Sequence, residues 1–142
     1  MNRYTLSNSS LRICMDLPNA GTIYGQRLTA PLPFHTLSDL ILKIDAVLDQ
    51  QNFPQAYLRT RTFSEKTAND AIALSAPTPQ EGMSRREVQL AQGRLITFDI
   101  LVATRRNATW QGSIIWQDTA AQEFSSDLEL LRLIDARLTP PA

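Results

Sequence analysis

The sequence is poor in the residues on which most metal and nucleophile chemistry depends. Its 142 residues include one cysteine, Cys14, and one histidine, His35. A lone cysteine forms no intrachain disulfide, and one cysteine with one histidine cannot complete a usual zinc set. No GxSxG elbow accompanies His35, and the phosphate-binding motifs GxGxxG and GxxxxGK[ST] are missing as well. We therefore predict no enzyme activity, no cofactor and no metal site, with Cys14 buried and inert and His35 in a loop or capping role.

Charge of one sign and long apolar runs are lacking too. Fourteen Lys and Arg balance fourteen Asp and Glu, which gives a formal net charge of zero and removes the usual signature of a nucleic-acid binder. No apolar run approaches the length of a membrane span, and the start MNRYTLSNSS has no signal-peptide core. The expectation is a soluble cytoplasmic protein without a membrane partner.

What the sequence does contain is a repeated segment. Residues 112–138 read as a strand, a loop and a helix, and residues 21–48 match them when Phe34 is aligned with Phe124. The alignment also brings Ile44 onto Ile134, within apolar positions at helical spacing. Strand, loop, cap and helix match in order, which favours a duplication over the alternative of chance similarity between two amphipathic helices.

Both helices of the repeat begin with a capping signal. Thr36 and Ser126 carry hydroxyls that can accept hydrogen bonds from the first-turn amides. Asp39 and Glu129 follow three residues later, where a carboxylate can reach back to the start of the helix. Helices over 37–49 and about 127–138 are therefore predicted.

The remaining elements follow from alternation and turn residues. Apolar alternation predicts a hairpin over 10–28 and a second one from strands 94–104 and 110–117. Further strands are expected at 56–63 and 85–91, loops at 29–33 and 118–123, and 64–82 is irregular.

The predicted fold is a single α+β domain over 1–142. Units at about 10–49 and 94–138, joined by an insert at 50–93, give the order ββα–insert–ββα. Each unit has faces that it cannot bury alone, so the two are expected to share one sheet. The result is a two-layer sandwich, with four to six antiparallel strands and both helices on one face.

One candidate partner-binding surface combines arginines with an aromatic residue. Arg59 and Arg61 lie two apart on a predicted strand and so point to the same side, while Arg105 and Arg106 lie at a predicted hairpin tip beside Trp110. Such a surface suits an acidic protein or a phosphate backbone, and the alternative is a set of ordinary solvated arginines.

Other conspicuous residues are predicted to be structural. Trp110 and Trp116 share a strand face with apolar neighbours, which favours the core over a stacking platform. Asp45 and Asp135 are the acidic pair of the repeat, and each is expected on the solvated edge of its helix. A carboxylate enzyme built on these two residues is the less favoured alternative.

The segments NATWQGSIIW, FSSDLELLRLIDARL and NFPQAYLRTRTF resemble small uncharacterised proteins of anaerobic gut bacteria. The three segments together comprise 37 residues, and the resemblance implies no activity.

The prediction of function is a non-enzymatic module that binds a protein partner or a second copy of itself. An accessory or inhibitor protein of a bacterial mobile element is one such function. The alternative is a nucleic-acid-binding domain that uses the arginine-rich strand and hairpin tip.

Overall fold

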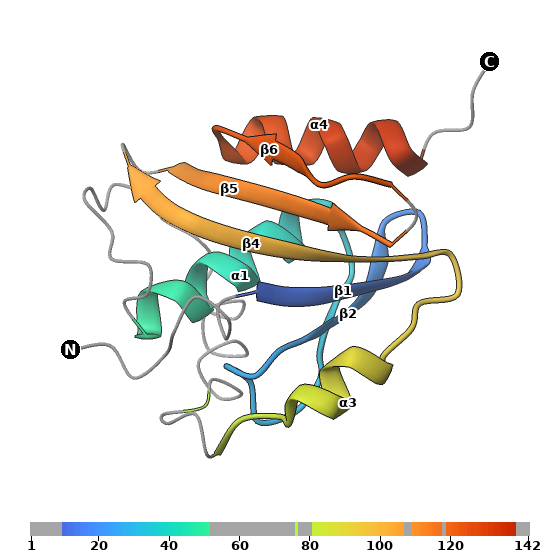
Figure 1. Ribbon diagram of the computed structural model, residues 1–142, viewed down its shortest axis with the longest axis vertical. Coiled ribbons are helices and arrows are strands. Elements are labelled where there is room, and N and C mark those ends of the chain that lie inside the picture. The colour runs from blue at the N-terminus through green and yellow to red at the C-terminus, as the bar shows by residue number, and fades with distance from the viewer. Residues whose placement is uncertain (1–9, 52–75, 77–80, 107–108, 118, 139–142) are drawn as a thin grey trace.

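The fold is known from a computed structural model that describes residues 10–51, 76, 81–106, 109–117 and 119–138. It is an α+β fold whose described residues form six strands and three helices (Figure 1). In chain order these are β1 Ser10–Leu17, β2 Ala20–Tyr24, β3 Leu32–Phe34, α1 Leu37–Gln51, α3 Arg85–Leu90, β4 Ile96–Arg106, β5 Thr109–Trp116, β6 Gln122–Phe124 and α4 Asp127–Leu138.

All six strands belong to one antiparallel sheet in the order β3-β2-β1-β4-β5-β6. The first three strands and the last three thus occupy separate halves, and β1 and β4 join at the centre. The predicted α+β class and the upper limit of the predicted strand number are confirmed.

Three elements differ from the prediction. The short strands β3 and β6 fall in segments that we expected to be loops, and α3 replaces the strand expected at 85–91. The prediction of a strand at 85–91 is wrong because Ser84 and Glu87 form a complete capping box, which starts a helix there. The strand expected at 56–63 lies outside the described residues.

The two halves share an unusual backbone detail. Gly21 pairs with Phe34 on one side and Met15 on the other, and a β-bulge follows Met15. Gly112 pairs with Phe124 and with Val102, and a bulge follows that residue too. A Cβ atom at Gly21 would lie 2.1 Å from a backbone oxygen of β1, and one at Gly112 would lie 1.9 Å from a backbone oxygen of β4, so both positions require glycine.

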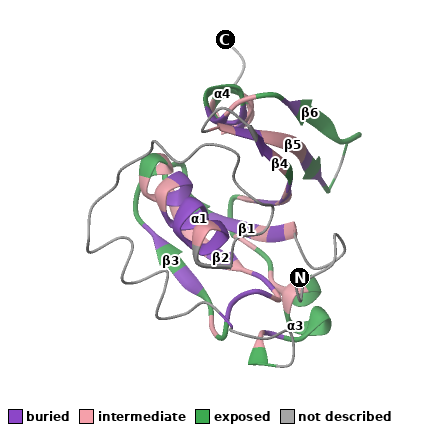
Figure 2. Cartoon of the chain, turned by 90° about the vertical axis from the view of Figure 1, so that its left-hand side faces the viewer, coloured by how far each residue is buried: buried purple, intermediate pink, exposed green. Residues whose placement is uncertain are grey.

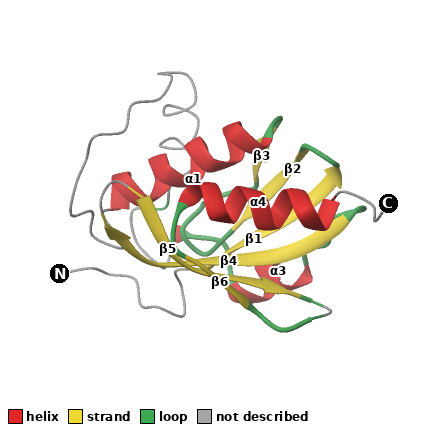
Figure 3. Cartoon of the chain, turned by 90° about the horizontal axis from the view of Figure 1, so that it is seen from above, coloured by secondary structure: helices red, strands yellow, loops and turns green. Residues whose placement is uncertain are grey.

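The core lies between the sheet and the pair α1 and α4. Figures 2 and 3 show these two helices on the same side of the sheet, with α3 on the opposite side. Alternate residues of β1 and β4 point into the core, as alternation predicts. They pack with Ile44 and Ile134 in one cluster, whose sheet members include Leu11, Ile13, Met15, Phe98, Ile100 and Val102.

Both tryptophans belong to this core. Trp110 is 1% exposed and Trp116 is 3% exposed, which confirms their predicted place. The Trp116 ring packs against Phe98 with their centroids 5.1 Å apart. The Trp110 indole reaches Asp45 of α1, and Arg137 of α4 lies over the Trp116 ring.

Candidate functional site

An apolar groove of about 460 Å³ separates the N-terminal halves of α1 and α4. Leu128 is the most exposed of its apolar residues, with 57% of its surface accessible. The lining combines residues from both helices with one residue of β5, and it comprises Ser38, Ile41, Leu42, Thr109, Ser126, Asp127, Leu128 and Leu131. We call this feature the interhelical groove.

The predicted caps fix where the two helices begin and hence where the groove opens. The hydroxyl of Thr36 accepts a hydrogen bond from the Asp39 amide at 2.9 Å, and the carboxylate of Asp39 accepts from the His35 amide at 3.0 Å. These two bonds hold the start of α1 in place. This places exposed His35 in the capping position that the sequence predicts.

The second helix repeats this geometry. The hydroxyl of Ser126 accepts from the Glu129 amide at 3.1 Å, and the Glu129 carboxylate accepts from the Ser125 amide at 2.8 Å. The groove therefore lies between two helix starts whose amides are already engaged by side chains of their own chain.

The floor of the groove is polar and tied to β5. Asp127 is buried, and its Oδ1 accepts hydrogen bonds from the Thr109 hydroxyl at 2.9 Å and from the Trp110 amide at 2.8 Å. In return, the Thr109 hydroxyl accepts from the Asp127 amide at 2.9 Å. These three bonds fix α4 against the sheet, and they leave one acidic residue as the only charged member of the lining.

A buried polar network lies on the α1 side of the same strands. The indole nitrogen of Trp110 donates to Asp45 at 3.1 Å, and Asp45 is only 5% exposed. The Arg105 guanidinium donates to the carboxylate of Asp49 and to the backbone oxygen of Leu48. Both contacts cross from the second half of the chain to the first, so they join the two halves.

The structure buries two of the five residues of the predicted arginine and tryptophan surface. Arg105 is 3% exposed and Trp110 is 1% exposed, so neither side chain is presented to a partner. Arg106 is in β4 opposite Thr109, and its side chain lies outside the described residues. Arg59 and Arg61 also lie outside the described residues.

The acidic pair of the repeat has two different environments. Asp135 is exposed, as predicted, whereas Asp45 is buried against Trp110. The prediction of a solvated edge is wrong for Asp45, because its partner comes from a strand 65 residues further along the chain. With one carboxylate buried in the core and the other in solvent, the two do not form one site.

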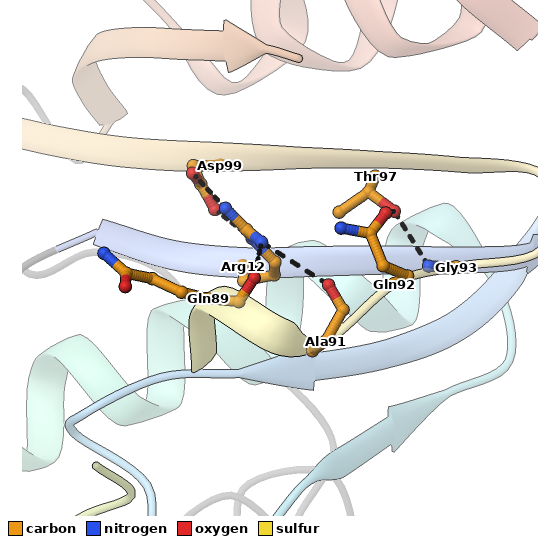
Figure 4. A network of polar contacts seen from close by, with 7 residues as sticks. All are labelled: Arg12, Gln89, Ala91, Gln92, Gly93, Thr97 and Asp99. Carbon is orange, nitrogen blue, oxygen red and sulfur yellow. Dashed lines mark hydrogen bonds and ion pairs between the residues drawn. The ribbon is translucent and has the colours of Figure 1, made fainter. Parts of the chain in front are cut away.

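On the opposite face, Arg12 holds α3 to the sheet (Figure 4). Its guanidinium donates to both carboxylate oxygens of Asp99, at 2.9 and 3.1 Å, and to the backbone oxygens of Gln89 at 2.9 Å and Ala91 at 3.4 Å. The hydrogen bond to Asp99 raises the pKa of Arg12 above its ordinary value. One partly buried arginine thus links β1, β4 and the end of α3.

Cys14 lies on this face, next to Arg12 along β1. It is 2% exposed, and burial raises the pKa of its thiol from 9.0 to about 11. A thiol held protonated in this way is a poor nucleophile.

No group of three or more His, Cys, Asp or Glu side chains in the described part of the chain is arranged to hold a metal ion. The helices within the described ranges also lack the combination of length and hydropathy needed to cross a bilayer.

Comparison with known proteins gives no match to this chain among protein-family models, curated proteins or solved structures.

Sequence reasoning missed the interhelical groove, although one signal for it was present. In the aligned repeat, Leu128 takes the position of Ser38. A leucine outside the core-facing positions of α4 indicates an apolar contact with something other than the sheet. Its partner across the groove, Leu42, depends on how α1 and α4 approach each other, which the repeat pattern does not specify.

Proposed function

We propose that the protein is a non-enzymatic protein-binding module that receives an amphipathic helical segment in the interhelical groove. The observation that carries this proposal is the exposed apolar lining, above all Leu128 at 57% exposure. A module of this kind fits an accessory or inhibitor protein, such as one encoded by a bacterial mobile element.

The spacing of the lining favours a helix as the occupant. Leu128 and Leu131 lie three residues apart on α4, and Ser38 and Ile41 have the same spacing on α1. Side chains one turn apart on two neighbouring helices form ridges, and the groove between such ridges accepts the ridge of a third helix. Recognition of an amphipathic helix in an apolar groove is a recurring mode of protein binding.

The charge of the lining restricts the occupant further. Asp127 is the one charged residue among the eight that line the groove. An acidic side chain brought against it would be repelled, whereas a neutral or basic one is compatible. The partner segment should therefore combine apolar residues one turn apart with a neighbouring basic residue.

Two other modes of binding have less support. Addition of a partner strand would use β3 or β6, but each has only three residues, and β3 contains Pro33, which has no amide hydrogen to donate. The nucleic-acid alternative relied partly on Arg105, and its guanidinium is occupied by Asp49 and Leu48.

We also infer that the two halves arose by duplication of a strand–strand–strand–helix unit. The matching bulges beside Gly21 and Gly112 support this inference, as do the two equivalent sets of capping bonds. The register at the centre of the sheet supports it as well. The bulges follow Met15 and Val102, so equivalent residues of β1 and β4 are 87 positions apart (102 minus 15). By this spacing Arg12 is equivalent to Asp99, and the two residues pair with each other, as expected where two equivalent strands meet.

The groove can be tested with a phage-displayed library of amphipathic helical peptides selected against the wild-type protein alone. We expect the selected peptides to lose about tenfold or more in affinity for Leu128→Asp, because burying one leucine contributes roughly 1.5–3 kcal/mol. Leu17→Asp is the matched control, since Leu17 is 58% exposed and lies outside the groove. Equal affinity for wild type and Leu128→Asp would overturn the proposal.

A further inference from the structure

Helix α3 is ordered without burying any of its own residues. A six-residue helix is too short to be stable alone in water. Hydrogen bonds hold it instead, through the capping box of Ser84 and Glu87 at its start and through Arg12 at its end. The sequence thus fixes a helix whose side chains contribute little to the core.

What α3 presents to solvent is one large apolar residue and a basic turn. Leu90 is 68% exposed, the most of any large apolar residue in the described part of the chain. Arg86 precedes it by four residues, which places both on the same face of the helix, and Arg85 and Arg86 are exposed. The helix has one acidic residue, Glu87, whose carboxylate accepts a hydrogen bond from the Ser84 amide. Two arginines and one glutamate leave α3 with a net positive charge.

The geometry points to a second copy of this chain as an occupant of the interhelical groove, with α3 of one molecule docked between α1 and α4 of the next. This inference rests on the proposed function, and it names one partner for that site. Leu90 would pack against the exposed Leu128 and the partly buried Leu131, and Arg86 would bring a positive charge near Asp127, the acidic residue of the lining.

The positions of the two surfaces determine what kind of assembly results. Helix α3 lies on one side of the sheet, and α1 and α4 lie on the other (Figures 2 and 3). The interhelical groove, which α1 and α4 line, is therefore on the side away from α3. A molecule therefore cannot fill its own groove with its own α3. Because different surfaces meet, each contact leaves a free groove at one end and a free α3 at the other, so the association is head-to-tail.

The contact should be weak, because α3 has only six residues. Its interface falls well below the roughly 1,200 Å² that marks the low end of stable complexes, so we expect a dissociation constant on the order of 0.1 mM. Sedimentation equilibrium over roughly 0.02–1 mM covers this range. The wild-type mass should rise with concentration above the monomer value of 15.9 kDa.

Two single substitutions make the test specific. Leu90→Asp removes the docking side chain but leaves the groove intact, and Leu128→Asp does the reverse. Each variant alone should associate about tenfold or more weakly, with a dissociation constant of about 1 mM or higher, so its mass should stay close to that of a monomer at about 0.1 mM. An equimolar mixture of the two should form dimers and nothing larger. Leu17→Asp should associate like the wild type, and circular dichroism should show that all three variants are folded.

A wild-type protein that stays monomeric at 1 mM would overturn the inference. So would a mixture that associates no more than the single variants do, or a Leu128→Asp variant that associates like the wild type. The proposed function is judged separately by the selected peptides. If those peptides depend on Leu128 while the wild type does not self-associate, the groove binds a different protein and only this inference fails. If neither result is obtained, both proposals fail.

Discussion

Replacing Asp45 by alanine should cost much more stability than the same change at Asp135, although the two occupy equivalent positions in the repeat. Asp45 is 5% exposed and accepts a hydrogen bond from the Trp110 indole at 3.1 Å. A hydrogen bond to a charged group contributes about 1.5–3 kcal/mol, and leaving the indole donor buried without an acceptor adds its desolvation penalty. Removing a buried charge offsets part of this loss. We expect Asp45→Ala to lower the free energy of unfolding by about 3 kcal/mol.

Urea denaturation followed by tryptophan fluorescence measures this difference, because Trp110 and Trp116 are both buried and report on the same core. In a chain of this length, 3 kcal/mol corresponds to a fall in Tm of roughly 10 °C. Asp135 is exposed, so Asp135→Ala should change stability by no more than about 0.5 kcal/mol. Asp45→Asn keeps an acceptor for the indole and should lose about half as much as Asp45→Ala. Equal losses at Asp45 and Asp135 would refute the assignment of a buried Asp45–Trp110 bond.

Three further perturbations test other parts of the fold. Arg12→Met should lower the free energy of unfolding by about 2 kcal/mol and speed amide hydrogen exchange in α3, because it removes the hydrogen-bond donors to the end of that helix. Unchanged exchange in α3 would show that Arg12 does not anchor the helix. The pKa of Cys14 is raised from 9.0 to about 11 by burial, so the folded state keeps a proton that the unfolded state loses, and stability should fall as the pH rises from about 9 through about 11. Cys14→Ala should remove that part of the pH dependence, and an unaltered slope would show that Cys14 is not its source. Gly112→Ala should lower stability by at least about 2 kcal/mol in urea denaturation, since the added Cβ would lie 1.9 Å from the backbone oxygen of Leu101; a near-neutral result would mean that β4 and β5 separate easily.

The two long helices could be predicted because their signals are local. Thr36 with Asp39 and Ser126 with Glu129 lie within one turn of each other, and the bonds they form are those that the sequence suggests. The strands of the two hairpins followed equally from alternation, since one face of each is buried against the helices. Local chemistry was enough wherever both members of an interaction are close in the chain.

The environments of Asp45 and Arg105 could not be predicted in this way. Asp45 is buried because Trp110 reaches it from β5, and Arg105 is buried because Asp49 lies at the end of α1. Such long-range contacts depend on how α1 crosses the second half of the sheet. A charged residue on a helix edge reads as solvated unless that crossing is known.

The short strands β3 and β6 show a different limit. Each has three residues, and Pro33 lies in the middle of β3. Proline in a short segment is typical of a loop, yet an edge strand tolerates it because the amide on its outer side needs no partner. Leu32 and Phe34 are both buried on either side of exposed Pro33, so alternation was present over too few residues to be recognised.

If the two halves arose by duplication, the residues that specialise the groove for a partner should be those at which the two copies differ. The core and capping positions are alike in both halves, since each must fold the same unit. At the groove, however, Leu128 stands where the first copy has Ser38, and Asp127 stands where it has Leu37. Two identical copies would build a symmetric groove with equal walls. The exchange gives this one an exposed apolar wall and an acidic residue on the α4 side alone, and this asymmetry would favour one direction of the helix that we propose as its partner.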